Sequence, residues 1–130
     1  MSPAEDHEHA RTYDAKRPQY VLAELLLKHL PDVRQKKILD VGCGVGEFIS
    51  VLKTNYGIYA VGVDGSDHCC AESLKKGLQC YNVNLEEERL PFKDESFDIV
   101  VSLEVIEHLW NTKHYLAEIQ RVLKKMEASL

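Results

Sequence analysis

Residues 38–46, which read ILDVGCGVG, decide the fold of this 130-residue chain. The short apolar run at 37–41 predicts a buried strand, and three glycines follow it directly. Residues 47–56 then place Phe48, Val51, Leu52 and Tyr56 at helical spacing. A strand that passes through a glycine-rich turn into a helix is typical of a parallel β-α-β unit.

The same alternation of strand and helix continues along the chain. Further strands are predicted at 58–63, 79–83 and 97–102. Helices are predicted between Pro18 and Pro31, from a cap at Ser66 or Asp67 to Gly77, and from a cap at Thr112. The last helix carries an apolar face of Tyr115, Leu116, Ile119, Val122 and Leu123, and the fourth strand reads as buried on both faces. This pattern predicts a three-layer α/β fold whose parallel sheet has the order 3-2-1-4, with the ligand site at the carboxyl ends of strands one and four.

Composition narrows the classes of function. The net charge of −5 argues against broad nucleic-acid binding, which favours a basic face. No apolar run approaches the roughly 20 residues of a membrane helix, and the polar residues 1–14 do not resemble a signal peptide, so we expect a cytoplasmic protein and no membrane partner. The cysteines, Cys43, Cys69, Cys70 and Cys80, contain no CxxC pair and are interpreted as free thiols that pack the interior.

The glycine loop has an acidic partner at a fixed distance along the chain. Asp64 ends the second predicted strand, 18 residues after Gly46, where a carboxylate can accept hydrogen bonds from both ribose hydroxyls. The loop spacing is GxGxG, because Glu47 stands where a dinucleotide motif has its third glycine. A negative side chain in the first helical turn disfavours a pyrophosphate but not a cationic sulfonium cofactor.

Together, several strings resemble class I, Rossmann-like methyltransferases, in the broad group that includes ubiquinone-biosynthesis methyltransferases. They are ILDVGCGVGEF, VGVDGS, LPFKDESFDIVVSLEVIEHL and IQRVLKK, and the resemblance covers about residues 10–125. It implies a methyltransferase that uses S-adenosyl-L-methionine. Residues 18–130 would form the cofactor-binding domain, incomplete at its end, and residues 1–17 an N-terminal tail and possible lid.

The resemblance also assigns roles by position. The methionine part of the cofactor would contact the loop at Asp40, Gly42, Cys43, Gly44 and Gly46. The ribose and adenosine would contact Asp64, Gly65 and Ser66 at the end of strand two, and the adenine would contact Asn84 and Leu85 at the end of strand three. The methyl end would contact Leu103 and Glu104 at the end of strand four, and an N-terminal lid would include Tyr13 and Arg17. The lid pair can equally be a plain surface segment.

After strand four, Glu104, Glu107 and His108 form the pattern ExxEH. The resemblance leaves three readings open: residues that shape the substrate site, a general base at His108, or a divalent-metal site as in small-RNA 2′-O-methyltransferases. That last family needs a further histidine downstream, so we expect no metal here. His108 and Glu104 are the catalytic candidates.

The printed sequence stops after residues 124–130, where family members continue with a glycine turn and a fifth strand. We therefore expect a fold truncated after strand four, whose open edge favours self-association or a partner chain. Residues 1–14 or 124–130 could instead fold across that edge. Two functions remain: transfer of a methyl group to an unidentified O, N or C acceptor, or a non-catalytic cofactor-binding or interaction module. The chain could also be a fragment or isoform of a longer methyltransferase.

Overall fold

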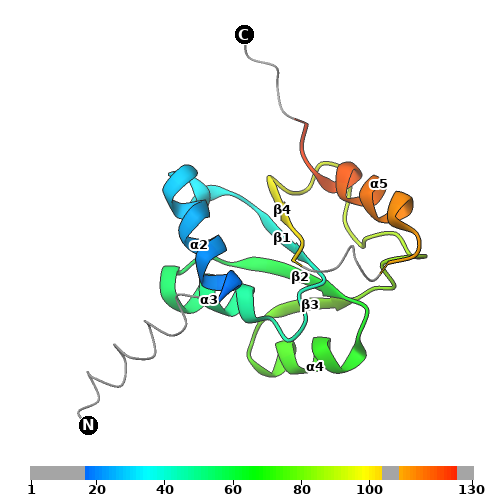
Figure 1. Cartoon of the computed structure of the whole chain (residues 1–130), viewed down its shortest axis with the longest axis horizontal. Coiled ribbons are helices and arrows are strands. Elements are labelled where there is room, and N and C mark those ends of the chain that lie inside the picture. The colour runs from blue at the N-terminus through cyan, green and yellow to red at the C-terminus, as the bar shows by residue number, and fades with distance from the viewer. Residues whose placement is uncertain (1–16, 104–108, 126–130) are drawn as a thin grey trace. The chain divides into compact units, whose positions relative to one another are not determined.

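The computed structural model describes residues 17–103 and 109–125, and the chain divides into two compact units, Met1–Arg34 and Gln35–Leu130 (Figure 1). The first unit contains helix α2 (Pro18–His29). Pro18 opens this helix, where its missing N–H removes no helical hydrogen bond. A 3₁₀ turn, η1 (Val33–Gln35), leads into the second unit, which holds the sheet.

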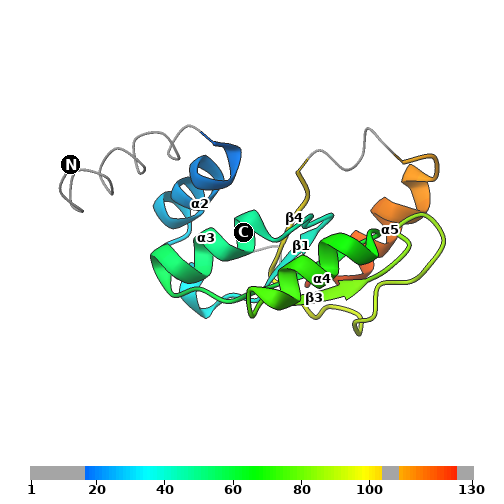
Figure 2. The same cartoon turned by 90° about the horizontal axis from the view of Figure 1, so that it is seen from below.

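The second unit is built on a four-stranded sheet, seen from a second side in Figure 2. Its strands are β1 (Ile38–Val41), β2 (Ala60–Asp64), β3 (Gln79–Asn82) and β4 (Ile99–Val101). All three pairings are parallel and the order is β3-β2-β1-β4, which confirms the predicted topology. Each strand lies within two or three residues of its predicted limits.

Three helices connect the strands or follow them. They are α3 (Glu47–Tyr56), α4 (Asp67–Lys75) and α5 (Thr112–Val122). Of the two predicted caps of α4, Ser66 and Asp67, the structure has Ser66, whose Oγ accepts the Cys69 N–H at 3.2 Å. The predicted cap of α5 at Thr112 was wrong by one residue: the Asn111 side chain accepts the His114 N–H at 3.2 Å.

Side chains alternate between the two faces of the sheet. One face packs against α5 in a cluster made of Leu39, Val41, Val63, Val83, Leu85, Leu90, Phe97, Tyr115 and Val122. The other face lies under α3, since a Cβ added at Gly62 would come within 2.7 Å of Ile49. Two expectations about this core were wrong. Leu116 is 51% exposed on α5, and Ile99 and Val100 are only partly buried on β4.

The beginning of the fourth strand is covered by the segment that follows α5. Phe97 forms a parallel bridge with Leu123: its N–H donates to the Val122 carbonyl at 2.9 Å, and its carbonyl accepts the Lys124 N–H at 2.8 Å. The open edge that we expected is therefore partly closed at Phe97. Within the described ranges, Ile99–Val101 pairs with β1 alone.

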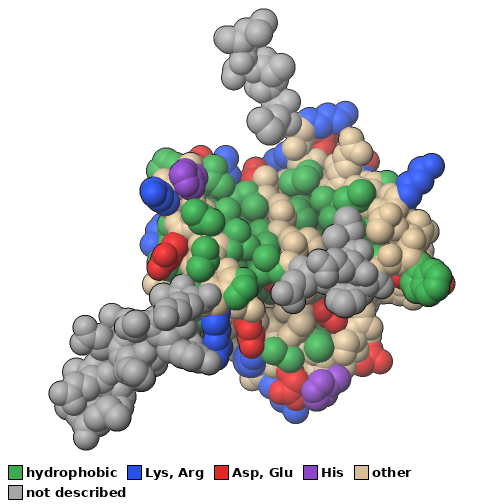
Figure 3. Space-filling model, viewed as in Figure 1, with side chains coloured by type: hydrophobic (Ala, Val, Ile, Leu, Met, Phe, Trp, Pro, Cys, Tyr) green, Lys and Arg blue, Asp and Glu red, His purple; other side chains and the backbone are tan. Residues whose placement is uncertain are grey.

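Figure 3 shows side chains of both signs mostly near the outline of the drawn face, with hydrophobic side chains over much of the rest, and the described residues in that view form no continuous band of lysine and arginine. No helix in the described part of the chain is long and apolar enough to cross a bilayer.

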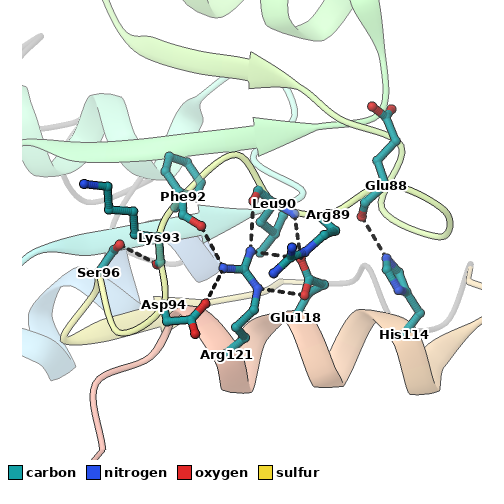
Figure 4. Close-up of polar contacts among 10 residues, drawn as sticks. All are labelled: Glu88, Arg89, Leu90, Phe92, Lys93, Asp94, Ser96, His114, Glu118 and Arg121. Carbon is teal, nitrogen blue, oxygen red and sulfur yellow. Dashed lines mark hydrogen bonds and ion pairs between the residues drawn. The ribbon is translucent and has the colours of Figure 1, made fainter.

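Arg121 on α5 fixes the loop that follows β3, and Figure 4 shows how the loop wraps around its guanidinium group. Arg121 donates to the carbonyls of Leu90 at 2.9 Å and Phe92 at 2.8 Å, and to Asp94 Oδ1 at 2.9 Å. It also binds both oxygens of Glu118, at 2.9 and 3.0 Å, and Glu118 Oε1 accepts the Leu90 N–H at 2.8 Å. The hydrogen bonds from Arg121 lower the pKa of the Glu118 carboxyl, so the pair is ionised.

Arg121→Met should destabilise the domain by about 3 kcal/mol, because the largely buried Glu118 carboxylate would be left with the longer, 4.0 Å contact with Arg89 as its ion pair. The matched control is Lys75→Met, which removes the exposed Lys75–Glu72 ion pair and should change stability by less than about 0.5 kcal/mol. Urea unfolding measures both. Equal losses in the two variants would contradict the role given to Arg121.

Candidate functional site

The glycine loop between β1 and α3 is shaped by backbone angles that favour glycine. Gly42, Gly44 and Gly46 have φ values of 77°, 57° and 83°, in the left-handed region. The N–H groups of Gly42 and Cys43 both donate to the Val63 carbonyl, at 2.7 and 3.0 Å. These bonds hold the loop against the end of β2.

Asp64, the last residue of β2, binds the loop and the start of α4 at the same time. Its Oδ2 accepts the Gly44 N–H at 2.8 Å and its Oδ1 accepts the Ser66 N–H at 2.9 Å. A ribose ligand was predicted at Asp64, with a helix-capping or loop role as the less favoured reading, and these two hydrogen bonds show the second role. Each carboxylate oxygen can accept a second hydrogen bond, so both roles are compatible.

Two side chains that the sequence did not single out hold the same loop, one from α4 and one from the residue that follows it. The buried Ser73 hydroxyl donates to the Gly44 carbonyl at 3.2 Å, and Lys76 Nζ donates to the Val45 carbonyl at 3.0 Å. A Cβ added at Gly46 would meet the Leu78 side chain at 2.6 Å, whereas one added at Gly44 would meet nothing within 4 Å. The loop is thus packed at Gly46 and open at Gly44, where a ligand can approach the main chain.

Asp40 brings a second carboxylate to this loop from β1. Its side chain is 3% exposed, and burial, with the charge of Asp64 as a smaller cause, raises the pKa of Asp40 from 3.8 to about 7. Two carboxylates close together raise the cost of ionising both, and a cation bound nearby would lower that cost. The site therefore favours a positively charged ligand.

The segment after β3 forms the next wall. Asn84 Oδ1 accepts the Glu86 N–H at 3.0 Å, and the Asn84 N–H donates to Glu88 Oε1 at 2.8 Å. Two contacts tie this segment to the start of α5: the Trp110 N–H donates to Glu86 Oε1 at 2.6 Å, and His114 Nε2 lies 2.7 Å from the Glu88 carbonyl oxygen. The adenine contacts expected from Asn84 and Leu85 stay predictions.

The predicted site residues fall into three groups. Those at the carboxyl ends of β1 and β2 are brought together as expected: Asp40, Gly42, Cys43, Gly44, Gly46, Asp64, Gly65 and Ser66. Asn84 and Leu85 follow β3, and Leu103 follows β4, at the same end of the parallel sheet. Arg17 belongs to the other compact unit, so its lid role stays a prediction, while Tyr13, Glu104, Glu107 and His108 lie outside the described residues.

A family model described as a methyltransferase domain matches residues 39–126, a segment that begins in β1 and contains the whole of the loop site. The chain belongs to this methyltransferase domain family. Relatives named as S-adenosylmethionine-dependent methyltransferases occur among both curated proteins and solved structures, so the family implies that cofactor.

Individual relatives of this methyltransferase domain differ in what their names say they act on. The chain is 34% identical over 99 residues to norajmaline N-methyltransferase of Rauvolfia serpentina, covering 71% of this chain and 34% of that protein. It is 37% identical over 92 residues to tRNA (carboxymethyluridine(34)-5-O)-methyltransferase of Saccharomyces cerevisiae, covering 68% and 30%. The chain thus spans about a third of the length of these curated relatives.

A solved structure also matches the methyltransferase domain. It is a complex between the Trm112 methyltransferase activator of Haloferax volcanii and a putative methyltransferase. The TM-score is 0.67 at 27% identity, over 88% of this chain and 52% of that chain.

Among residues 17–103 and 109–125, no group of three or more His, Cys, Asp or Glu side chains is placed to hold a metal ion.

Asp40 should make the stability of the methyltransferase domain depend on pH. Its folded pKa of about 7 exceeds the ordinary value of 3.8, so its contribution is fully present below about pH 3.8 and is lost as pH rises through 7. The side chain of Asp40→Asn cannot titrate. Relative to the wild type, the free energy of unfolding of this variant should therefore increase by roughly 3–4 kcal/mol between pH 4 and pH 8. Urea unfolding across that range measures the difference; parallel pH profiles would contradict the shift.

Proposed function

We propose that this domain binds S-adenosyl-L-methionine in the loop at residues 42–46 and transfers its methyl group to an O, N or C acceptor. The observation that carries the proposal is the geometry of Gly44. Its backbone is fixed by Asp64 and Ser73, yet the side where a Cβ would stand is empty for 4 Å. The protein's own hydrogen bonds therefore hold the loop, and a ligand can approach its main chain closely at Gly44.

The cofactor, when bound, supplies the reactive methyl group on a sulfonium centre. The chain contributes binding and alignment. Asp40 and Asp64 provide negative charge beside the loop, and the segment after β3 provides a wall that α5 holds in place. Glu104 and His108 stay the proposed residues beside the acceptor, with His108 as a general base.

The acceptor class is left open in this proposal. One relative is named for norajmaline and another for a tRNA carboxymethyluridine, so their names point to different acceptors. The acidic net charge, and the lack of a continuous basic band among the described residues in Figure 3, favour a small or protein acceptor over an extended nucleic acid bound through its phosphates.

A non-catalytic module that binds the cofactor and a partner protein is the second candidate. It is favoured by the activator complex among the structural relatives and by the part of β4 that pairs only with β1 in the described ranges. Incubation with methyl-labelled cofactor and a cell extract separates the two. Transfer of label to an acceptor supports the enzyme. Binding of the cofactor without transfer, in every extract and with every partner tested, supports the module.

Gly44→Ala should weaken binding of S-adenosylhomocysteine by tenfold or more, since the new methyl group enters the open side of the loop. Gly77→Ala is the matched control: Gly77 also has a positive φ, of 76°, but it lies after α4, and a Cβ there would meet only the end of the Lys53 side chain at 3.5 Å. Calorimetry on both folded variants measures affinity. Equal affinities would place the ligand elsewhere, and tighter binding of NAD than of S-adenosylhomocysteine to the wild type would contradict the choice of ligand.

Asp64 can be tested apart from its role in holding the loop by varying the ligand. The wild type should bind S-adenosylhomocysteine ~1.5–3 kcal/mol more tightly than an analogue without the 2′- and 3′-hydroxyls, the usual worth of hydrogen bonds to a charged group. In Asp64→Ala both ligands should bind with similar affinity. If the variant retains the full preference for the hydroxylated ligand, Asp64 serves the loop and does not bind ribose.

A further inference from the structure

Three of the four cysteines meet beneath the glycine loop, and the proposed function uses none of their thiol chemistry. Cys43 comes from the loop, Cys70 from α4 and Cys80 from β3. The Cys80 Sγ lies 2.9 Å from the Cys70 Sγ and 3.4 Å from the Cys43 Sγ. Each of the three residues is less than 9% exposed, whereas Cys69, the neighbour of Cys70, is partly exposed.

The packing around the three sulfurs explains why they meet. Gly62 on β2 is paired in register with Cys80 on β3, and it carries no side chain between the sheet and the helices. A Cβ there would stand 2.6 Å from the Cys43 Sγ, so the glycine makes the space that this sulfur occupies. The Cys70 thiol approaches from α4, with its Sγ 3.7 Å from the Asp64 carbonyl oxygen.

We propose that Cys70 and Cys80 form a reversible disulfide that links α4 to β3 under the glycine loop. With a peroxide as oxidant, one thiol attacks the O–O bond, becomes a sulfenic acid and releases water. The second thiol then attacks that sulfur, the S–S bond forms and a second water leaves. Two thiols lose two hydrogens and two electrons, and hydrogen peroxide is reduced to two waters.

The distances between the sulfurs indicate which two thiols pair, and their burial indicates how fast they oxidise. Cys80 lies between the other two sulfurs, but Cys70 is the nearer, so the Cys70–Cys80 bond needs the smaller movement. Burial raises the pKa of all three thiols to about 12, so the thiolate that begins the reaction is scarce at neutral pH. Oxidation should therefore be slow at first and faster as pH rises, with closure fast once a sulfenic acid forms.

The experiment uses the whole reduced chain, dilute hydrogen peroxide at pH 8.5, and quenching with iodoacetamide. Tandem mass spectrometry should find the segment that contains Cys70 linked to the segment that contains Cys80, with a loss of 2 Da and full reversal by dithiothreitol. The midpoint of thermal unfolding should rise by several degrees in the oxidised form, because the bond restricts the unfolded chain.

Cys69 and Cys70 are adjacent, so a pair of variants identifies the reacting sulfur. Cys69→Ser should keep the link to Cys80, and Cys70→Ser should lose it. Fragment ions of the linked wild-type peptides give the same assignment without relying on a variant that could fold poorly. Any of three results would overturn the proposal. They are a link that persists in Cys70→Ser, a dominant Cys43–Cys80 bond, or the absence of any linked peptide once peroxide has consumed the free thiols.

Discussion

The carboxylate of Asp64 is the interaction on which the rest of this domain depends. It ends β2, accepts the N–H of Gly44 in the preceding loop, and accepts the N–H of Ser66, the cap of the following helix. One side chain thus sets the spacing between a glycine turn, a strand end and a helix start. The proposed ligand site lies where these three elements meet.

A buried carboxyl group in the same region lowers the stability of the folded state near neutral pH. Asp40 is buried, and this burial, with the charge of Asp64 as a smaller cause, raises its pKa to about 7, so ionising Asp40 near neutral pH costs free energy. Functional sites commonly hold groups in states that a stability optimum would not choose. A cationic ligand bound nearby would lower the cost of ionising Asp40, and this gain would add to the binding free energy of the ligand.

The strand order could be predicted because it depends on local patterns: four apolar runs separated by helical segments permit few parallel arrangements. The site at the carboxyl ends followed from the glycines and Asp64. The Arg121–Glu118 pair could not be predicted, since its partners Leu90, Phe92 and Asp94 lie about 30 residues earlier and are mostly backbone carbonyls. Exposure of Leu116 and pairing of Phe97 with Leu123 likewise depend on tertiary packing that a helical or strand period does not encode.

The contacts of Arg121 also distinguish the loop after β3 from an ordinary surface loop. Residues 84–94 contain no helix or strand, and surface loops of this kind ordinarily accept insertions and protease nicks. Here the loop carbonyls are bound from the side of α5, so lengthening the loop would detach it from the helix. An engineer who wishes to insert a tag or to divide the protein into two fragments should avoid this loop despite its irregular backbone.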